Sequence, residues 1–198
     1  CSPNQSNVKP ESVKHPPTAV ISEIYPLIDG GLSPSKAIVG EPFAVSANIF
    51  KDGHDIMRAR LRWRGFADGT FFSPQPWEEA PMEHLENDRW QGSFTVENTG
   101  MHEFLIEGWG DRFASWVHAF EKKCEADDEE LPLVLQEGAL IVEKSAEIAK
   151  AGQDQETFRQ LFAIAETMRK HPPSVVADLV LSEDLAFLMA LFPDRDLA

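Results

Sequence analysis

The chain has 198 residues, 42% of them hydrophobic, and its 33 acidic side chains outnumber its 18 basic ones to give a formal net charge of −15. Such a chain can form one domain or two small ones, each with a core of useful size. The acidic balance repels nucleic acid phosphates and anionic lipid head groups, and no apolar run approaches the roughly 18 residues of a membrane span, so neither nucleic acid nor membrane is an expected partner.

Cysteine and histidine usage gives no sign of a disulfide framework or a metal site. The two cysteines, Cys1 and Cys124, suit a reducing cytosol, and no two histidines stand at metal-ligand spacing. Cys1 begins the chain without a methionine, which favours a trimmed start; a lipid-anchored N-terminal cysteine would look the same. We therefore expect a cytoplasmic protein.

The first two-thirds of the chain predict a tail followed by β-strands. Residues 1–19 are rich in Pro, Ser, Asn and Lys and predict a disordered tail. From 20 to 125, short alternating segments separated by Gly, Asn, Asp and Pro turns predict an antiparallel β-sandwich domain, with a long loop over 65–81. The predicted strands are 20–26, 43–50, 57–64, 89–96, 101–109 and 115–123.

The segment 57–64 alternates most sharply. Ala59, Leu61 and Trp63 share one face, and arginines occupy every position of the other. Four cations on one strand face repel one another unless acids lie opposite, so we expect them to pair with Glu and Asp on neighbouring strands. The alternative is a docking surface for an acidic domain. The arginines are Arg58, Arg60, Arg62 and Arg64.

The segment 101–109 carries large apolar groups on both faces, with Phe104 and Ile106 on one side and Leu105 and Trp109 on the other. A strand with one face in water does not carry this pattern. We therefore expect the outer face to be covered by the helices, by another domain or by a second copy of the chain.

Asp111 and Arg112 stand between two predicted strands and are bracketed by Trp109 and Trp116. We expect a hairpin loop whose charges face water or each other, with the two indoles packing at the sheet end. A catalytic aspartate needs an acid or base partner, and none can be argued across this loop.

After Glu125 the apolar spacing changes from two to 3.6 residues, which predicts a helical domain over 126–198. The first helix runs from Leu131 to about Lys150, and the second begins at Asp154 as its N-cap. Ser174 and Ser182 are expected to cap two shorter helices, so that four helices form a small bundle or a hairpin pair.

Motifs of catalysis or cofactor binding do not occur: the sequence holds no phosphate-binding glycine loop, no nucleophile elbow and no zinc pattern. We assign no catalytic, cofactor-binding or metal-binding residue.

Several blocks together resemble the N-terminal region of the bacterial maltosyltransferases, members of the α-amylase superfamily that extend α-1,4-glucan from α-maltose-1-phosphate. These blocks are "IDGG" (28–31), "FKDGHDIMRARLRWR" (50–64), the segment 82–123 with its "DRFASWVHAFEKK", "LQEGALIVEKSAEIA" (135–149) and the closing "LMALFPDRDLA". The resemblance extends from about residue 20 to 198.

The resemblance implies an α+β fold by segments, in which an immunoglobulin-like β-sandwich is followed by a small α-helical bundle inserted into it. It also implies a homodimer, packing against a downstream catalytic barrel of the same chain, and α-glucan and maltose-1-phosphate as substrates of the whole enzyme. The catalytic Asp and Glu of the family lie in that barrel, so the 198 residues themselves are expected to be inactive, and no cofactor is required.

Nine residues are therefore interface candidates, for the barrel or for the dimer mate. They are Arg58, Arg60, Arg62, Arg64, Leu105, Trp109, Asp111, Arg112 and Trp116. The resemblance further implies that the chain returns to the sandwich after the helices, which leaves one sheet edge unpaired here.

Two alternatives remain open at this stage. The chain could be an independent α-glucan-binding sandwich in which Trp77, Trp109 or Trp116 stacks on sugar rings. It could also be a lipid-anchored surface protein attached through Cys1.

Overall fold

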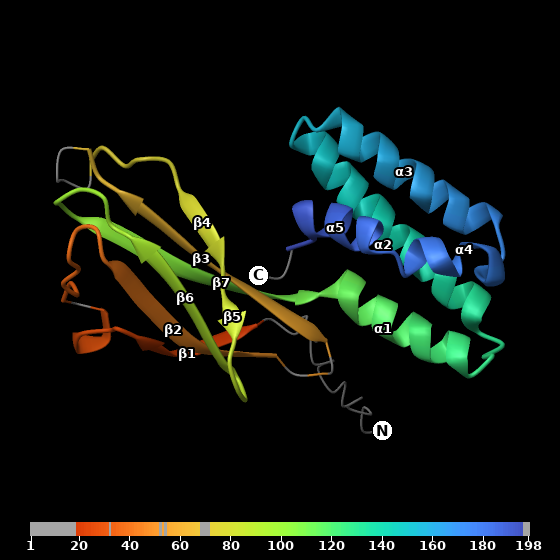
Figure 1. Ribbon diagram of the computed structural model, residues 1–198, viewed down its shortest axis with the longest axis horizontal. Helices are drawn as coiled ribbons and strands as arrows, with labels where there is room; N and C mark the ends of the chain where they lie inside the picture. The colour runs from red at the N-terminus through yellow and green to blue at the C-terminus, as the bar shows by residue number, and fades with distance from the viewer. Residues whose placement is uncertain (1–18, 32, 52, 54, 68–71, 196–198) are drawn as a thin grey trace, which may run out of the picture.

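The computed structural model describes residues 19–31, 33–51, 53, 55–67 and 72–195. The expected disordered tail over 1–19 lies outside this part except for Ala19, as does Cys1. Two antiparallel sheets are followed by five helices, in agreement with the predicted α+β class (Figure 1). One sheet has the order β1-β2-β6-β5 and the other β4-β3-β7. The strands are β1 (Val20–Tyr25), β2 (Pro42–Phe50), β3 (Ile56–Gly65), β4 (Glu78–Pro81), β5 (Glu83–His84), β6 (Arg89–Thr95) and β7 (His102–Asp111), with a short 3-10 turn η1 (Asp29–Gly31) after β1.

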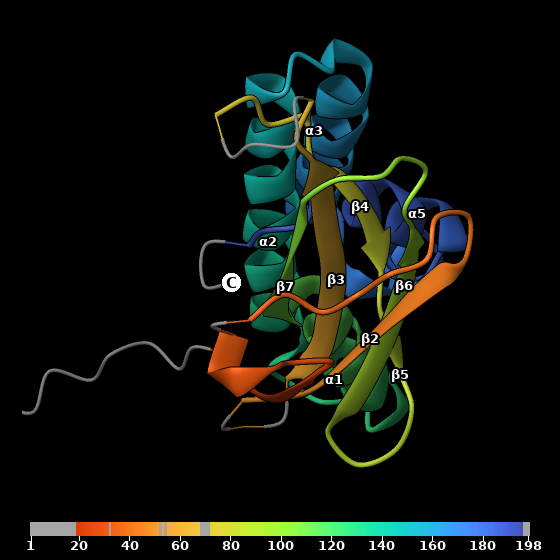
Figure 2. The same cartoon turned by 90° about the vertical axis from the view of Figure 1, so that its left-hand side faces the viewer.

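The two sheets share a core built from the alternating apolar positions of their strands. Val45, Ala47 and Ile49 of β2 are buried, and so are Ala59 and Leu61 of β3, as the period of two predicts. The core residues come from β2 and β6 of one sheet and from β3 and β7 of the other, the strands that Figure 2 labels.

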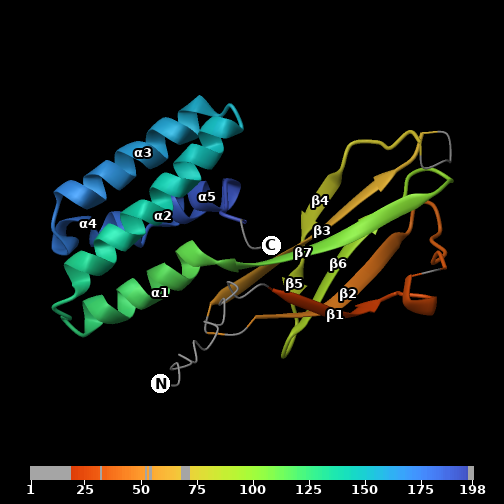
Figure 3. The same ribbon diagram turned by 180° about the vertical axis from the view of Figure 1, so that it is seen from behind.

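The helices are α1 (Arg112–Glu125), α2 (Leu131–Ala151), α3 (Gln155–Lys170), α4 (Pro173–Val180) and α5 (Glu183–Leu191). They share a second core, separate from that of the sheets, to which all five contribute (Figure 3). The predicted stripe of α2 is confirmed, because Leu135, Ala139, Val142 and Ala146 are all buried in it. No helix of the described part is both long and apolar enough to cross a membrane.

The predicted helix starts are confirmed at two positions and wrong at a third. Asp154 caps α3 by accepting the Thr157 N–H, and Ser182 caps α5 by accepting the Leu185 N–H. Ser174 does not cap α4: Pro172 occupies the N-cap position and Pro173 begins the helix, because a proline lacks the N–H that would otherwise be unsatisfied there.

The predicted strand over 115–123 is wrong, because α1 occupies 112–125. Its apolar residues recur at helical spacing and pack into the core of the helices: Phe113, Trp116 and Phe120 are buried there. Within 115–123, Trp116 and Phe120 are four residues apart and would share a face in a strand as well as in a helix, which is why the sequence favoured a strand. The predicted loop over 65–81 is also partly wrong, since β4 forms in its last four residues.

Strand β7 passes into α1 without a loop, and the residues after α5 return toward the end of β7, where Arg195 lies over the Trp109 ring. Among the described strands, β7 pairs only with β3 and so forms one edge of its sheet. Of the candidate residues of the sequence, Leu105, Trp109 and Asp111 lie on this edge strand, Arg112 begins α1, the four arginines lie on the neighbouring β3, and Trp116 lies in α1.

Candidate functional site

The four arginines of β3 lie on the face of the sheet that points away from the shared core. In the register of β3 with β7, Arg58 is opposite Trp109, Arg60 is opposite Glu107 and Arg64 is opposite Glu103. The predicted pairing with acids on neighbouring strands is confirmed, because each arginine makes an ion pair on this face. Leu105, half-buried, lies between the two glutamates, opposite Arg62.

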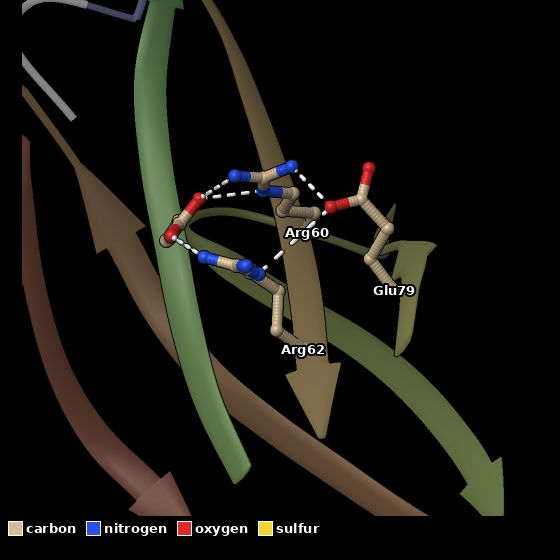
Figure 4. A network of polar contacts seen from close by, with 4 residues as sticks. Arg60, Arg62 and Glu79 are labelled. Atoms are coloured by element: carbon tan, nitrogen blue, oxygen red, sulfur yellow. Dashed lines mark hydrogen bonds and ion pairs between the residues drawn. The ribbon is translucent and has the colours of Figure 1, made fainter. Parts of the chain in front are cut away.

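The centre of this face is a four-membered network. Arg60 bonds both Glu79 of β4 and Glu107 of β7, and the Arg62 Nη1 donates to Glu107 Oε1 at 3.0 Å. Figure 4 shows Arg60 and Arg62 side by side on β3, with Glu79 reaching toward them from the adjacent strand. We call these four residues the Arg60 network.

The Arg60 network changes the acidity of its central carboxylate. Burial by itself raises the pKa of Glu107, but the hydrogen bonds and positive charges of Arg60 and Arg62 outweigh it, so that the pKa lies below its ordinary value. Glu107 therefore stays charged and engaged by two guanidinium groups. A carboxylate held in this way is a poor candidate for a catalytic acid, which needs a proton to give.

Trp77 stands beside the outer end of the row. The Arg64 guanidinium carbon lies 4.4 Å from the ring centroid and that of Arg62 lies 5.1 Å from it. These cation–π contacts place two guanidinium groups against the ring, and a sugar ring stacking on the same face would have to displace them.

Asp111 ends β7 and caps α1, so it is not part of a hairpin loop as the sequence predicted. Its Oδ1 accepts the Ala114 N–H at 2.9 Å and its Oδ2 accepts from the Arg58 Nε at 3.1 Å. Ser115 completes the junction: its hydroxyl donates to the Asp111 carbonyl and accepts the Ile56 N–H, at 2.7 and 2.8 Å. Asp111 is thus a structural residue that fastens the first turn of α1 to both β3 and β7.

Arg112 and Trp109 are joined to the end of the chain, which the sequence did not predict. Arg112 pairs with Asp194 at 3.4 Å, and the Arg195 guanidinium carbon lies 4.7 Å from the Trp109 ring centroid. Arg195 therefore covers the buried Trp109, and the expectation that the outer face of β7 is covered holds at this end of the strand. Both contacts come from the segment "PDR" (193–195), which follows α5 in the sequence.

Trp116 lies elsewhere. It is buried in the core of the helices, stacks on Phe120 with ring centroids 5.2 Å apart, and donates its indole N–H to the Val134 carbonyl. The structure therefore does not bring Trp109 and Trp116 together to close the sheet end, and Trp116 offers no face to a ligand.

A cleft of about 1280 Å³ separates the outer face of the β4-β3-β7 sheet from α1 and α5. Its sheet wall is charged, with Arg58, Arg60 and Glu79, whereas Phe113 and Met189 contribute to an apolar helix wall. The carboxylates of Glu79 and Asp111 in it are already bonded to arginine. Across the described ranges no group of three His, Cys, Asp or Glu is placed to hold a metal ion. This arrangement can bind charged groups, and the two carboxylates that arginines hold in it are not free for glycosyl chemistry.

Comparison with known proteins gives one consistent result. The family described as α-1,4-glucan:maltose-1-phosphate maltosyltransferase, domain N/S, matches residues 17–198. Proteins with the name α-1,4-glucan:maltose-1-phosphate maltosyltransferase are similar in sequence: that of Myxococcus xanthus is 34% identical over 178 residues, which are 90% of this chain and 26% of that protein. The protein of Chlorobaculum tepidum is 34% identical over 90% of this chain and 25% of its own length, and maltosyltransferase 1 of Streptomyces coelicolor is 32% identical over 89% and 25%. The chain thus spans about a quarter of the length of these relatives.

Proposed function

This chain belongs to the domain N/S family of the α-1,4-glucan:maltose-1-phosphate maltosyltransferases, and we propose that it serves as the non-catalytic accessory and dimerisation region of such an enzyme. The observation that carries the proposal is the family match over 17–198, combined with coverage of only a quarter of each relative. The charged face of the sheet supports it, because its carboxylates are bonded to arginines and not arranged for bond cleavage.

In the whole cytoplasmic enzyme, the reaction would be the transfer of maltosyl units from α-maltose-1-phosphate to α-1,4-glucan by a retaining double displacement. Phosphate would be the leaving group, and no cofactor would be needed. The nucleophile and the acid/base would lie in a downstream (β/α)₈ barrel, which requires about 250 residues of its own. The sheets would be an immunoglobulin-like sandwich and the helices a bundle inserted into it, with α1 belonging to the bundle whose core it shares.

The edge of β7 supports the proposed return of the chain to the sandwich. This strand has ten residues and pairs on one side only among the described strands. Its other edge can accept backbone hydrogen bonds from a further strand of the same chain. In the full-length enzyme, amide hydrogens of β7 should exchange more slowly than in the 198-residue chain; equal rates would contradict the proposed pairing.

Helix α5 offers a surface for the proposed homodimer. Phe187 is 65% exposed and Leu191, one turn later on the same helix face, is 48% exposed. Large apolar groups exposed together favour a protein partner. We expect Phe187→Glu in the full-length enzyme to shift the dimer toward monomer in analytical ultracentrifugation. Leu133→Glu on α2, at 63% exposure, is the matched control and should remain dimeric; equal behaviour of the two variants would contradict this surface.

Two measurements on the purified 198-residue chain test the non-catalytic role. The chain should show no release of phosphate from maltose-1-phosphate in the presence of glucan, and turnover would overturn the proposal. Titration with maltooligosaccharides should give little or no binding, since Trp77 and Trp109 carry stacked guanidinium groups and Trp116 is buried. Tight binding would favour the independent glucan-binding module instead.

A further inference from the structure

The cleft between sheet and helices contains an arginine, Arg195, whose buried Nε has no hydrogen-bond partner among the described residues. Arg195 lies over the Trp109 ring. No hydrogen bond or ion pair joins its guanidinium to another described residue. Burial and the nearby positive charge of Arg60 lower its pKa, while Glu79 and Glu107 are already engaged by Arg60 and Arg62. A desolvated cation without a partner is costly, which makes this position a strong attractor for an anion.

Two further arginines line the same cleft and keep donors available. Arg58 bonds Asp111 through Nε only, and Arg112 reaches Asp194 through a single terminal nitrogen at 3.4 Å. Their side chains are 57% and 62% exposed, so the remaining N–H groups face the solvent of the cleft. Arg58 is also the cross-strand partner of Trp109, on which Arg195 stacks, so all three guanidinium groups converge on one neighbourhood.

The arrangement of donors favours a phosphoryl group. The guanidinium groups of Arg58 and Arg112 pair with Asp111 and Asp194, and the nearby carboxylates of Glu79 and Glu107 are engaged by Arg60 and Arg62. Glu83 and Glu121 line the same cleft, so the site depends on the three guanidinium groups and not on an excess of positive charge in the cleft as a whole. A carboxylate has two oxygens in one plane and suits a single guanidinium fork, whereas a phosphoryl group has three terminal oxygens and suits donors from three directions.

We propose that Arg58, Arg112 and Arg195 form a binding site for a phosphate dianion, either inorganic phosphate or the phosphoryl group of a phosphomonoester such as a sugar phosphate. Trp109 forms its floor and holds the Arg195 fork in place. The site would let the sheet–helix junction respond to the concentration of a phosphorylated compound or of phosphate.

The test is a titration of the isotope-labelled 198-residue chain at constant ionic strength, with the Trp109 indole N–H resonance as reporter. Inorganic phosphate should shift this resonance with a Kd on the order of 1 mM, and acetate should do so much more weakly. Maltose-1-phosphate is titrated in the same way. A Kd equal to that of inorganic phosphate shows that the phosphoryl group alone is recognised, and a lower Kd shows that the sugar is recognised as well; either result supports the site.

Substitutions separate a built site from general charge. Arg195→Met should weaken phosphate binding by about tenfold or more, and Arg112→Met should weaken it independently if the first variant does not fold. Arg64→Met is the matched control, since it removes an equal charge from the same sheet face at a residue that does not line the cleft. Absence of a saturable shift, or an equal effect of Arg64→Met and Arg195→Met, would overturn the proposal. Either result would leave the accessory role proposed above untouched.

Discussion

The indole N–H of Trp116 in α1 donates a 2.8 Å hydrogen bond to the carbonyl oxygen of Val134 in α2, and the indole ring lies directly over Gly138, one turn further along α2. A Cβ at Gly138 would lie 2.0–2.4 Å from atoms of that ring. The glycine is therefore what allows α1 to approach α2 closely enough for this hydrogen bond.

Gly138→Ala should destabilise the helices. The indole cannot yield without losing its bond to Val134 and its stacking on Phe120, so the overpacking is expected to cost about 1–3 kcal/mol. Urea unfolding, monitored by circular dichroism, measures this loss of unfolding free energy. Gly152→Ala is the control: its Cβ would make only ordinary contacts of 3.4–3.5 Å, and its stability should differ little from that of the unaltered chain. Equal stability of Gly138→Ala and the unaltered chain would contradict the close packing.

Asp111→Ala should weaken the junction between β7 and α1, because it removes both the N-cap of the helix and the partner of Arg58. Loss of a cap costs about 0.5–2 kcal/mol. Asp111→Asn keeps a capping oxygen and loses only the ion pair with a largely exposed arginine, so it should retain most of the stability. Thermal unfolding distinguishes the two, and an equal loss for both variants would show that the charge, not the cap, is what matters.

Ser115→Ala should loosen the same junction from the helix side. The hydroxyl accepts from the Ile56 N–H of β3, and an alanine side chain removes this acceptor. We expect a loss of about 1–2 kcal/mol and faster amide exchange at Ile56. Ser174→Ala, at an exposed position of α4, is the control and should leave both quantities unchanged. Unaltered exchange at Ile56 would refute the link.

Glu107 should give the chain a distinct sensitivity to acid. Its folded-state pKa lies below the ordinary value of 4.5, so the unfolded chain binds the proton more readily. Its stabilising contribution is complete above that ordinary value and is lost as the pH falls through the lower folded-state pKa. Unfolding free energies measured across this acid range should fall more steeply for the unaltered chain than for Glu107→Gln.

At neutral pH, Glu107→Gln should itself cost about 1–3 kcal/mol, because Arg60 and Arg62 lose a charged acceptor at a half-buried site. Glu97→Gln, in the exposed turn before β7, is the control for removal of one negative charge. A Glu107→Gln variant with the pH dependence of the unaltered chain would contradict the role of this carboxylate.

The parts of the fold that follow from local pattern were predictable. The alternation around Ala59 and Leu61 indicated both the core face of β3 and its arginine face, and the caps at Asp154 and Ser182 marked two helix starts correctly. Helix α1 was not predictable in this way. Within its short segment the apolar residues fit a strand as well as a helix, and its N-cap Asp111 resembled a turn residue. What decides between them is the core formed with α2, which is a tertiary effect.

The site shows the same division. The sequence singled out Arg58, Asp111 and Arg112 but treated them as a strand row and a hairpin, since one chain pattern does not reveal which distant segment lies opposite. Arg195 was missed altogether: it follows α5 by only a few residues and reaches Trp109 because the chain turns back there. The alternation of Glu103 and Glu107 along β7 could have identified the partners of the arginines, because it matches theirs in antiparallel register.

Because β7 passes directly into α1, the orientation of the helical region relative to the sheets is set at residues 111–112. No connecting loop is present there to absorb a change in chain length, so one inserted residue would rotate every later helix by about 100° about the α1 axis. Insertions and deletions in relatives should therefore occur in the α1–α2 or α2–α3 connections. Deletion of one residue at 111–112 should displace the two walls of the cleft relative to each other even where both cores fold.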